Sequence, residues 1–172
     1  FRLVGSEMCI RDSIIAGLQY RDWALSHVLL THHHWDHVDG LGALLAACPA
    51  QVIGAAADAH RLANLNHALH EGDNLQIGSH SGEVIDVSGH TLGHIAVYFS
   101  ESKAVFTADS LMALGCGRLF EGSPQLMHQS LKKLAALPPD TLVYSGHEYT
   151  ISNLKFALSI EPDNQRLISR GS

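Results

Sequence analysis

A run of histidines between residues 31 and 37 is the part of this sequence with the clearest capacity for chemistry. The segment reads Thr-His-His-His-Trp-Asp-His and directly follows the apolar run Val-Leu-Leu. Imidazole nitrogens and carboxylate oxygens are the ligands that zinc and similar divalent metals prefer. His32 and His34 lie two residues apart, so in extended backbone both project to one side and can share an ion. Asp36 and His37 lie beyond the turn and can serve a second ion, which predicts two neighbouring metal sites.

Three later clusters place further metal-binding groups directly after expected strands. Residues 89–94 read Gly-His-Thr-Leu-Gly-His, Asp109 follows a strand-like run, and residues 145–148 read Ser-Gly-His-Glu. Loops at strand ends are where a protein scaffold usually displays catalytic groups. A carboxylate such as Asp109 has two oxygens and can bridge two metals that lie about 3.5–4 Å apart. The intervening His33 is expected to point away from the ions.

The elements that must position these clusters alternate between helices and strands at first and are mostly strands in the middle of the chain. Apolar periodicity and turn residues define them. Asp39 is an expected N-cap for one helix, and Ser123 followed by Pro124 begins another. The expected helices cover residues 14–20, 39–47, 56–65, 123–137 and 153–160, and the expected strands cover residues 27–31, 51–55, 75–77, 83–87, 95–99, 104–107 and 142–144. This order predicts an α/β fold in which helices cover a sheet.

The composition limits the class of protein. The chain has 172 residues, of which 46% are hydrophobic and 16% are charged, as is typical of one folded domain. A net charge of −6 without a cluster of Lys or Arg argues against a nucleic-acid partner. The longest apolar stretch, residues 41–57, is too short for a membrane span and is interrupted by proline and glycine. Cys9, Cys48 and Cys116 are odd in number and lack CxxC spacing, which favours free thiols in a reducing compartment. We therefore expect a cytoplasmic protein without a membrane partner.

The order of these motifs resembles that of the metallo-β-lactamase superfamily, which combines HxHxDH, then GHTxGH, then a lone aspartate and a late histidine. HxHxDH alone marks only the superfamily. Two further runs, Gly-Cys-Gly-Arg-Leu-Phe-Glu-Gly at residues 115–122 and Gly-His-Glu-Tyr-Thr at residues 146–150, are similar to the glyoxalase II family, the hydroxyacylglutathione hydrolases. Residues 153–157 and 161–164 resemble the start of that family's helical C-terminal region. The resemblance covers residues 14–167.

This resemblance implies a fold and a role for each candidate residue. The fold would be an αββα sandwich, incomplete here because the family's N-terminal strands and later C-terminal helices are missing. His32, His34 and His90 would bind the first metal, Asp36, His37 and His147 would bind the second, and Asp109 would bridge them. Asp36 and Asp109 are thereby the candidate catalytic residues. Arg118 and Tyr149 match positions that contact glutathione in the family, whereas His94 matches no ligand.

The activity implied by the resemblance is the hydrolysis of S-D-lactoylglutathione to glutathione and D-lactate, in methylglyoxal detoxification. The implied cofactor is a pair of divalent ions, with zinc first and iron or manganese as alternatives. Two such ions lower the pKa of a bridging water and supply hydroxide near neutral pH. The hydroxide would attack the thioester carbonyl, and a metal would stabilise the tetrahedral oxyanion. We expect a monomer whose partner is this small glutathione thioester.

The two ends of the chain depart from the family pattern. Residues 7–13 read Glu-Met-Cys-Ile-Arg-Asp-Ser and resemble the translation of a transposon adapter used in sequencing libraries, so we expect residues 1–13 to be non-native. Residues 14–148 are then expected to form a partial catalytic domain, and residues 149–172 the start of a truncated helical glutathione-binding region. Ala108 stands where the family usually has glycine before the bridging aspartate, and its methyl group is expected to crowd that loop.

Two other functions are kept as alternatives. A persulfide dioxygenase-like enzyme with one iron shares HxHxDH and Gly-Cys-Gly-Arg, but its usual form lacks the Phe-Glu-Gly and Glu-Tyr-Thr runs. Metal count and oxygen uptake separate it from a thioesterase. The second alternative is a metal-binding fragment without turnover, because missing strands expose a sheet edge and missing basic residues weaken the binding of glutathione. We therefore expect the full-length parent to be active and the fragment to be weak or unstable.

Overall fold

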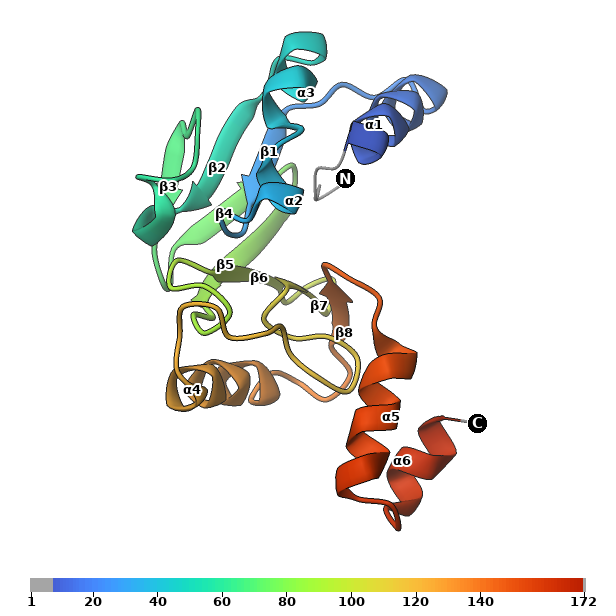
Figure 1. Cartoon of the computed structure of the whole chain (residues 1–172). Coiled ribbons are helices and arrows are strands. Elements are labelled where there is room, and N and C mark those ends of the chain that lie inside the picture. The colour runs from blue at the N-terminus through green and yellow to red at the C-terminus, as the bar shows by residue number, and fades with distance from the viewer. Residues whose placement is uncertain (1–7, 172) are drawn as a thin grey trace.

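The computed structural model describes residues 8–171, which fold into two β-sheets with helices on their outer faces (Figure 1). The helices are α1 (Met8–Tyr20), α2 (Trp35–Val38), α3 (Leu41–Ala47), the short 3-10 helix η1 (Ala56–Asp58), α4 (Pro124–Ala135), α5 (Thr150–Ile160) and α6 (Gln165–Arg170). The strands are β1 (His27–Leu30), β2 (Gln51–Ala55), β3 (His67–Leu69), β4 (Asn74–Ile77), β5 (His80–Asp86), β6 (Ile95–Phe99), β7 (Ala104–Ala108) and β8 (Leu142–Ser145).

The first sheet is parallel and contains β1, β2 and β3 in that order. Strands of a parallel sheet are covered on both faces and therefore tend to be continuous apolar runs. β1 and β2 follow this rule, because every residue after the first in each strand is buried. Their apolar runs are the signals from which both strands were predicted.

The second sheet has the order β4-β5-β6-β7-β8 and is antiparallel except for the parallel pair β7 and β8. β4 alternates exposed and buried residues, as a strand with one face on the core does. Since β5 and β7 both run antiparallel to β6, and β8 runs parallel to β7, the C-terminal ends of β5, β7 and β8 lie at one edge. Each of these three strand ends leads into a loop with a candidate ligand.

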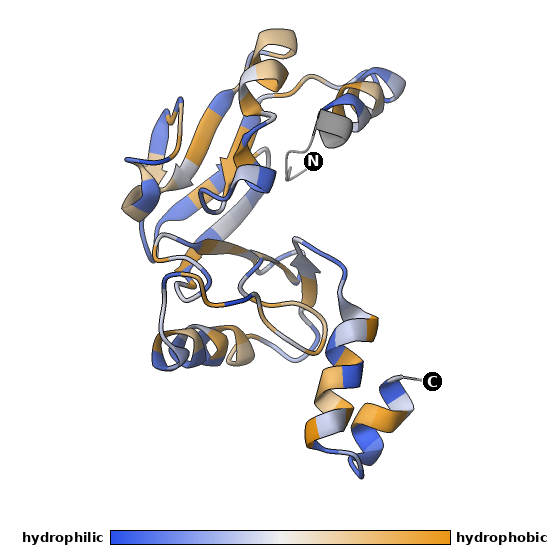
Figure 2. Cartoon of the chain, viewed as in Figure 1, coloured by the Kyte–Doolittle hydropathy of each residue, from blue (hydrophilic) through white to orange (hydrophobic). Residues whose placement is uncertain are grey.

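The main core lies between the two sheets. Leu29, Ile53 and Leu69 of the first sheet pack with Val84, Val97 and other buried residues of the second. A second cluster joins α1 and α3 to the outer face of the first sheet, and a third joins α4 to the outer face of the second. Figure 2 shows the apolar strands enclosed between these layers. The predicted αββα sandwich is confirmed.

One backbone hydrogen bond joins the two sheets at the edge that carries the candidate ligands. The amide of Ile95, at the start of β6, donates to the carbonyl of Thr31, directly after β1, at 3.1 Å. The histidine-rich turn of the first sheet is therefore held against the loop between β5 and β6 of the second sheet. This contact brings residues 31–37 to the same edge as residues 89–94.

Several element boundaries differ from the predictions. α1 begins at Met8, six residues before the expected start, and runs across residue 13 without a break. Asp39 is not an N-cap, because it is the C-cap of the additional helix α2, and α3 begins after Gly40. The helix expected over residues 56–65 is wrong: only the single turn η1 forms there, since Asp58 and Asn66 make contacts with distant residues instead. β3 and α6 were not predicted.

Helix α5 and strand β8 leave apolar side chains uncovered in the part of the chain that the structure describes. Ile151, Phe156 and Ile160 of α5 are each about two-thirds exposed, and every residue of β8 is exposed. Within residues 8–171, no helix has both the length and the apolar character required to cross a membrane. The expected domain boundaries at residues 13 and 148 stay predictions.

Candidate metal centre

The three histidines expected around a first metal lie together at the sheet edge. One ring nitrogen of each of His32, His34 and His90 lies within 4.8 Å of the others. His34 Nδ1 and His90 Nε2 approach to 2.9 Å, and the His32 ring centroid lies 4.8 Å from that of His34. His32 follows β1, and His90 lies in the loop between β5 and β6. The two sheets thus each contribute to this first group.

The three residues expected around a second metal form an adjoining group. His147 Nε2 lies 3.2 Å from Asp36 Oδ2, and His37 Nε2 lies 3.7 Å from the same oxygen. Asp36 and His37 belong to the short helix α2, whereas His147 follows β8. The amide of Gly146, beside His147, donates to the carbonyl of Ala108 at 2.9 Å. This bond aligns the His147 loop with the loop that carries Asp109.

Asp109 lies between the two groups. Its Oδ1 is 3.3 Å from His37 Nε2, and its Oδ2 is 3.5 Å from His90 Nε2 and 3.4 Å from His147 Nε2. Burial alone would raise the pKa of this carboxyl, but the contact with His37, and then the charges of His147 and His90, lower it below its ordinary value. Asp109 is therefore an anion that faces both groups. The structure brings all seven residues expected as ligands into one cluster.

The backbone before Asp109 is strained. Ala108 has a φ of 43°, in the left-handed region that costs a residue with a Cβ about 1–2 kcal/mol. The pairing of β7 with β8 also shifts register between Phe106 and Ala108. The chain turns sharply here, and the turn directs Asp109 toward the histidines. The structure shows a positive φ at Ala108, and the crowding of the loop by its methyl group stays a prediction.

Hydrogen bonds from neighbouring groups orient the rings. His90 Nδ1 lies 2.6 Å from the carbonyl of Arg118, which can only accept, so Nδ1 carries the proton and Nε2 keeps its lone pair. Thr31 Oγ1 lies 3.1 Å from His32 Nδ1, so His32 contacts the hydroxyl through Nδ1 and its Nε2 has no hydrogen-bond partner among the described residues. Partners on the far side of a ring are typical of histidines that bind metals, because they select the tautomer and the ring orientation.

The donor set fits divalent metal ions. Burial, and then the neighbouring imidazoles of His94 and His37, lower the pKa of His32, and burial followed by His90 lowers that of His34. Both rings are therefore neutral near pH 7, as ligands must be. Among the described residues, His32 Nε2, His37 Nε2 and Asp109 Oδ1 are buried and have no hydrogen-bond partner. Buried polar atoms without a partner are costly, and a cation in each group would satisfy them, the first at His32, the second at His37 and both at Asp109.

The comparison with known families agrees with this geometry. The sequence model of the metallo-beta-lactamase superfamily matches residues 5–147. The chain belongs to the metallo-beta-lactamase superfamily. Membership in this superfamily, together with the seven His and Asp side chains, implies a two-metal site.

Individual members of the superfamily are similar over most of this chain. A hydroxyacylglutathione hydrolase of Jannaschia sp. (strain CCS1) is 65% identical over 157 residues, which are 91% of this chain and 61% of that protein. The crystal structure of ETHE1 from Myxococcus xanthus superposes with a TM-score of 0.72 at 31% identity, over 86% of this chain and 69% of that one. The crystal structure of BLEG-1 B3 metallo-beta-lactamase gives a TM-score of 0.74 at 25% identity, over 80% and 77% of the two chains. The present chain spans 61–62% of the length of the curated hydrolases that it matches.

A pocket of about 600 Å³ opens beside this candidate metal centre. Asp36, His90, Asp109 and His147 contribute to its floor, and Arg118 and Tyr149 also line it. The Arg118 guanidinium lies 5.5 Å from the centroid of the Phe120 ring, and the Tyr149 ring stacks on His147 at 5.4 Å. The two residues expected to contact substrate therefore lie beside the ligands, in a pocket large enough for a small molecule.

Other residues around the site were not expected from the sequence. Phe120 packs edge-on against the rings of His34 and His90, at 5.2 and 5.4 Å between centroids. His94, which matches no ligand of the family, is completely buried and stacks on His32 at 4.5 Å, and burial with the charge of His90 lowers its pKa to about 3. Asp58 is a charged residue in a run of alanines that follows a buried strand, and this contrast was the sequence signal for a further polar group beside the site.

Proposed function

We propose that the protein hydrolyses thioesters between glutathione and 2-hydroxy acids, with S-D-lactoylglutathione as its substrate, in the removal of methylglyoxal. The identity of 65% to a hydroxyacylglutathione hydrolase is the observation that carries this choice of substrate. The position of Asp109 between two groups of candidate ligands supports the choice of chemistry. Two metals that share a carboxylate are a recurrent arrangement for hydrolysis.

The proposed division of ligands follows the two groups in the structure. His32, His34 and His90 would hold the first ion, Asp36, His37 and His147 would hold the second, and Asp109 would bind both. When bound, the pair of ions supplies an activated water and a positive charge beside the scissile carbonyl. Zinc is the first choice for a site of imidazoles and carboxylates, and iron and manganese accept the same donors.

The chain's own residues would bind the substrate and manage its protons. Asp36 and Asp109 line the pocket and are the carboxylates placed to orient the attacking water and accept its proton. Arg118 offers a planar guanidinium to the carboxylates of glutathione, and Tyr149 offers a ring and a hydroxyl. The leaving group is a thiolate, which departs without strong assistance from an acid because thiols have a pKa of about 8.5.

Release of free thiol from S-D-lactoylglutathione tests the proposal. The full-length parent protein, purified and reloaded with zinc, is expected to release glutathione from this substrate and to act much more slowly on the coenzyme A thioester of the same acid. Asp109→Asn is expected to lose at least about a hundredfold in rate, because it weakens both metal sites. Equal rates on the two thioesters would refute the assignment of glutathione, and oxygen uptake with one iron per chain would refute hydrolysis.

We also propose that the protein acts as a monomer in the cytoplasm, without nucleic acid or membrane as a partner. Cys48 and Cys116 are free thiols in the structure, which supports a reducing compartment. The net charge of −6 does not favour binding to nucleic acid. Sedimentation of the metal-loaded protein at micromolar concentration is expected to give the mass of a single chain, and a dimer mass would overturn the monomer assignment.

A further inference from the structure

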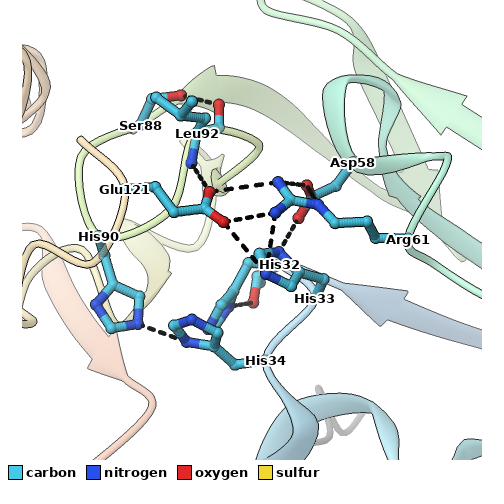
Figure 3. Close-up of polar contacts among 10 residues, drawn as sticks. His32, His33, His34, Asp58, Arg61, Ser88, His90, Leu92 and Glu121 are labelled. Atoms are coloured by element: carbon cyan, nitrogen blue, oxygen red, sulfur yellow. Dashed lines mark hydrogen bonds and ion pairs between the residues drawn. The ribbon is translucent and has the colours of Figure 1, made fainter.

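A charged network lies beside the first metal group (Figure 3), and none of its four residues, His33, Asp58, Arg61 and Glu121, lines the pocket. Its centre is Asp58, whose side chain is completely buried. One oxygen of this carboxylate lies 2.8 Å from His33 Nδ1, and the other accepts from Arg61 Nε at 2.9 Å and from Arg61 Nη2 at 2.5 Å. A buried carboxylate is expensive unless it is paired and hydrogen-bonded, and this one is both.

Arg61 extends the network to the loop of residues 115–122. Its Nη1 donates to Glu121 Oε1 at 2.5 Å, while Nη2 lies 3.3 Å from Glu121 Oε2. The guanidinium therefore contacts two carboxylates at once, and its rigid planar fork of donors fixes their relative positions more closely than a lysine ammonium would. Glu121 Oε2 in turn accepts from the backbone amide of Leu92 at 2.9 Å.

The network also determines the tautomer of His33. Arg61 Nη1 lies 3.2 Å from His33 Nε2, and arginine has no acceptor, so this contact is a hydrogen bond only if Nε2 accepts. The proton of the neutral ring then lies on Nδ1 and faces Asp58. His33 is thus held in one orientation, with Nδ1 toward Asp58 (Figure 3) and its ring in edge contact with that of His34, at 5.1 Å between centroids.

Each contact of the network ends on a segment that positions a ligand of the first group. His33 lies between His32 and His34 in the chain. Leu92, two residues after His90, is held at its amide by Glu121 and at its carbonyl by Ser88 Oγ at 2.6 Å.

Asp58 and the loop of Glu121 also contact segments that position ligands of the first group. A Cβ added to Gly93 would lie 2.5 Å from Asp58 Cγ, so the carboxylate packs directly against the backbone of the His90 loop. Glu121 lies three residues after Arg118, whose carbonyl accepts from His90 Nδ1. Among the described residues, no hydrogen bond of Asp58, Arg61 or Glu121 reaches the second group of ligands.

We propose that His33, Asp58, Arg61 and Glu121 are positioning residues for the first metal only. They hold the backbone on both sides of the His32–His34 pair and of His90, so that three imidazole nitrogens meet at one point. The inference rests on the two-metal assignment proposed above, but it does not depend on the identity of the substrate. It gives His33 a role. His32 and His34, on either side of it, are expected to bind metal directly.

Titration of the metal-free protein with zinc, against a chromophoric chelator that competes for the ion, tests this proposal. The wild-type protein is expected to bind two ions in two resolved steps. His33→Ala is expected to weaken one step by about tenfold, as loss of an outer partner of a metal ligand commonly does, and to leave the other within about twofold. Lys103→Ala, which removes an exposed ion pair with Asp140, is the control and is expected to change neither step.

A conservative variant separates positioning from general destabilisation. The Nδ2 of asparagine lies as many bonds from Cα as the Nδ1 of histidine, so His33→Asn keeps a donor for Asp58, whereas His33→Gln places its donor one bond too far. His33→Asn is therefore expected to restore zinc affinity to within about threefold of wild type, and His33→Gln is not. Equal affinities for the asparagine and glutamine variants would overturn the proposed contact.

The affected step is assigned in two backgrounds that each lack one site. In His147→Ala, which leaves the first group complete, adding His33→Ala is expected to weaken the remaining step by about tenfold. In His90→Ala, which leaves the second group, the same addition is expected to have no effect. Equal weakening in both backgrounds, or in neither, would refute a role confined to the first metal.

Two further results keep the test decisive. If His33→Ala does not fold, Glu121→Gln replaces it. This isosteric change removes the charge and one of the two acceptor oxygens that hold Arg61 and the amide of Leu92, so weakening of the first step by this variant supports the same role. A wild-type protein that binds one ion would refute the two-metal assignment, and this inference with it. A wild-type protein that binds two ions and shows no change in any variant would refute this inference alone.

Discussion

Replacement of Gly146 by alanine is expected to damage the metal site while leaving the fold almost intact. A Cβ at this position would lie closer than 3.0 Å to Asp109 Oδ1 and 3.2 Å from His37 Cε1. Gly146 does not have a positive φ, so the backbone accepts alanine without strain. Carbon and oxygen atoms in contact settle near about 3.5 Å, so the Asp109 oxygen must retreat by roughly 1 Å.

The metal-free protein tolerates this movement. Asp109 Oδ1 is the end of a side chain, so its rotation lengthens the 3.3 Å contact with His37 Nε2 and leaves the backbone hydrogen bonds in place. We expect a loss of about 1 kcal/mol, at the low end for overpacking, which lowers Tm by about 2–4 °C in a domain of this size. The bound metals do not tolerate it, because ligand distances are held within about 0.2 Å. Zinc affinity is expected to fall at least about tenfold, and thioester hydrolysis about a hundredfold.

The assay measures Tm without metal, zinc affinity by chelator competition and release of thiol from S-D-lactoylglutathione. Gly42→Ala is the matched control, because a Cβ there meets nothing within 4 Å in the helix α3. It is expected to stabilise the protein by about 0.5–1 kcal/mol and to leave zinc affinity unchanged. Wild-type zinc affinity in Gly146→Ala would refute the placement of Asp109 as a shared ligand.

Three further predictions concern strain, pH and substrate. Ala108→Gly relieves a positive φ and is expected to leave the free energy of unfolding unchanged or to raise it by up to about 1 kcal/mol. Ala104→Gly in the same strand is expected to lower the free energy of unfolding by about 1 kcal/mol, and equal losses of Tm in the two variants would contradict backbone strain at Ala108. A hydrogen bond from Arg61 lowers the pKa of Glu121 from 4.5 to about 2, so the charged form stabilises the fold above pH 4.5 and this contribution is lost as the pH falls toward 2. The difference in Tm between wild type and Glu121→Gln is thus expected to shrink from pH 6 to pH 3, and a constant difference would show that the pair contributes nothing. Arg118→Ala is expected to raise KM for the glutathione thioester about tenfold with little change in kcat, because the carbonyl that orients His90 is retained; a fall in kcat alone would place Arg118 in the chemical step instead.

The candidate ligands could be predicted because their order along the chain reports their position in the fold. His32 and His34 follow a buried strand, and Asp109 and His147 follow β7 and β8, which are parallel neighbours and end at one edge. The spacing of residues 32–37 then separates the ligands into two groups. For these residues, the local sequence and the topology of the sheets place the same side chains together.

The positioning network could not be predicted, because its contacts join residues that are far apart in the sequence. His33 meets Asp58 across 25 residues, and Arg61 meets Glu121 across 60. The alanines and leucines around Asp58 and Arg61 favour a helix, and intrinsic propensity is a weak guide where tertiary contacts compete. Here Asp58 is held by His33, and the side chain of Asn66 accepts from the amide of Val52 at 2.7 Å, so the chain turns instead.

The short elements β3 and α2 could not be predicted for a related reason. β3 has three residues, of which only Leu69 is buried, so it shows no alternation of apolar and polar residues. Its register is set by parallel pairing with β2 and not by its own side chains. Asp39 has the residue type of an N-cap, but α2 ends on it, because residues 35–38 already form a helical turn that places Asp36 and His37 at the metal site.

Hydrolysis of S-D-lactoylglutathione, followed while zinc is added to the metal-free full-length parent protein, tests the central claim most directly. If His32, His34 and His90 hold one ion, Asp36, His37 and His147 hold another, and Asp109 joins them, the rate of thiol release will rise until two equivalents of zinc are bound and then stop rising. A rate that reaches its maximum at one equivalent, or a protein that binds two ions and releases no thiol, would contradict the account.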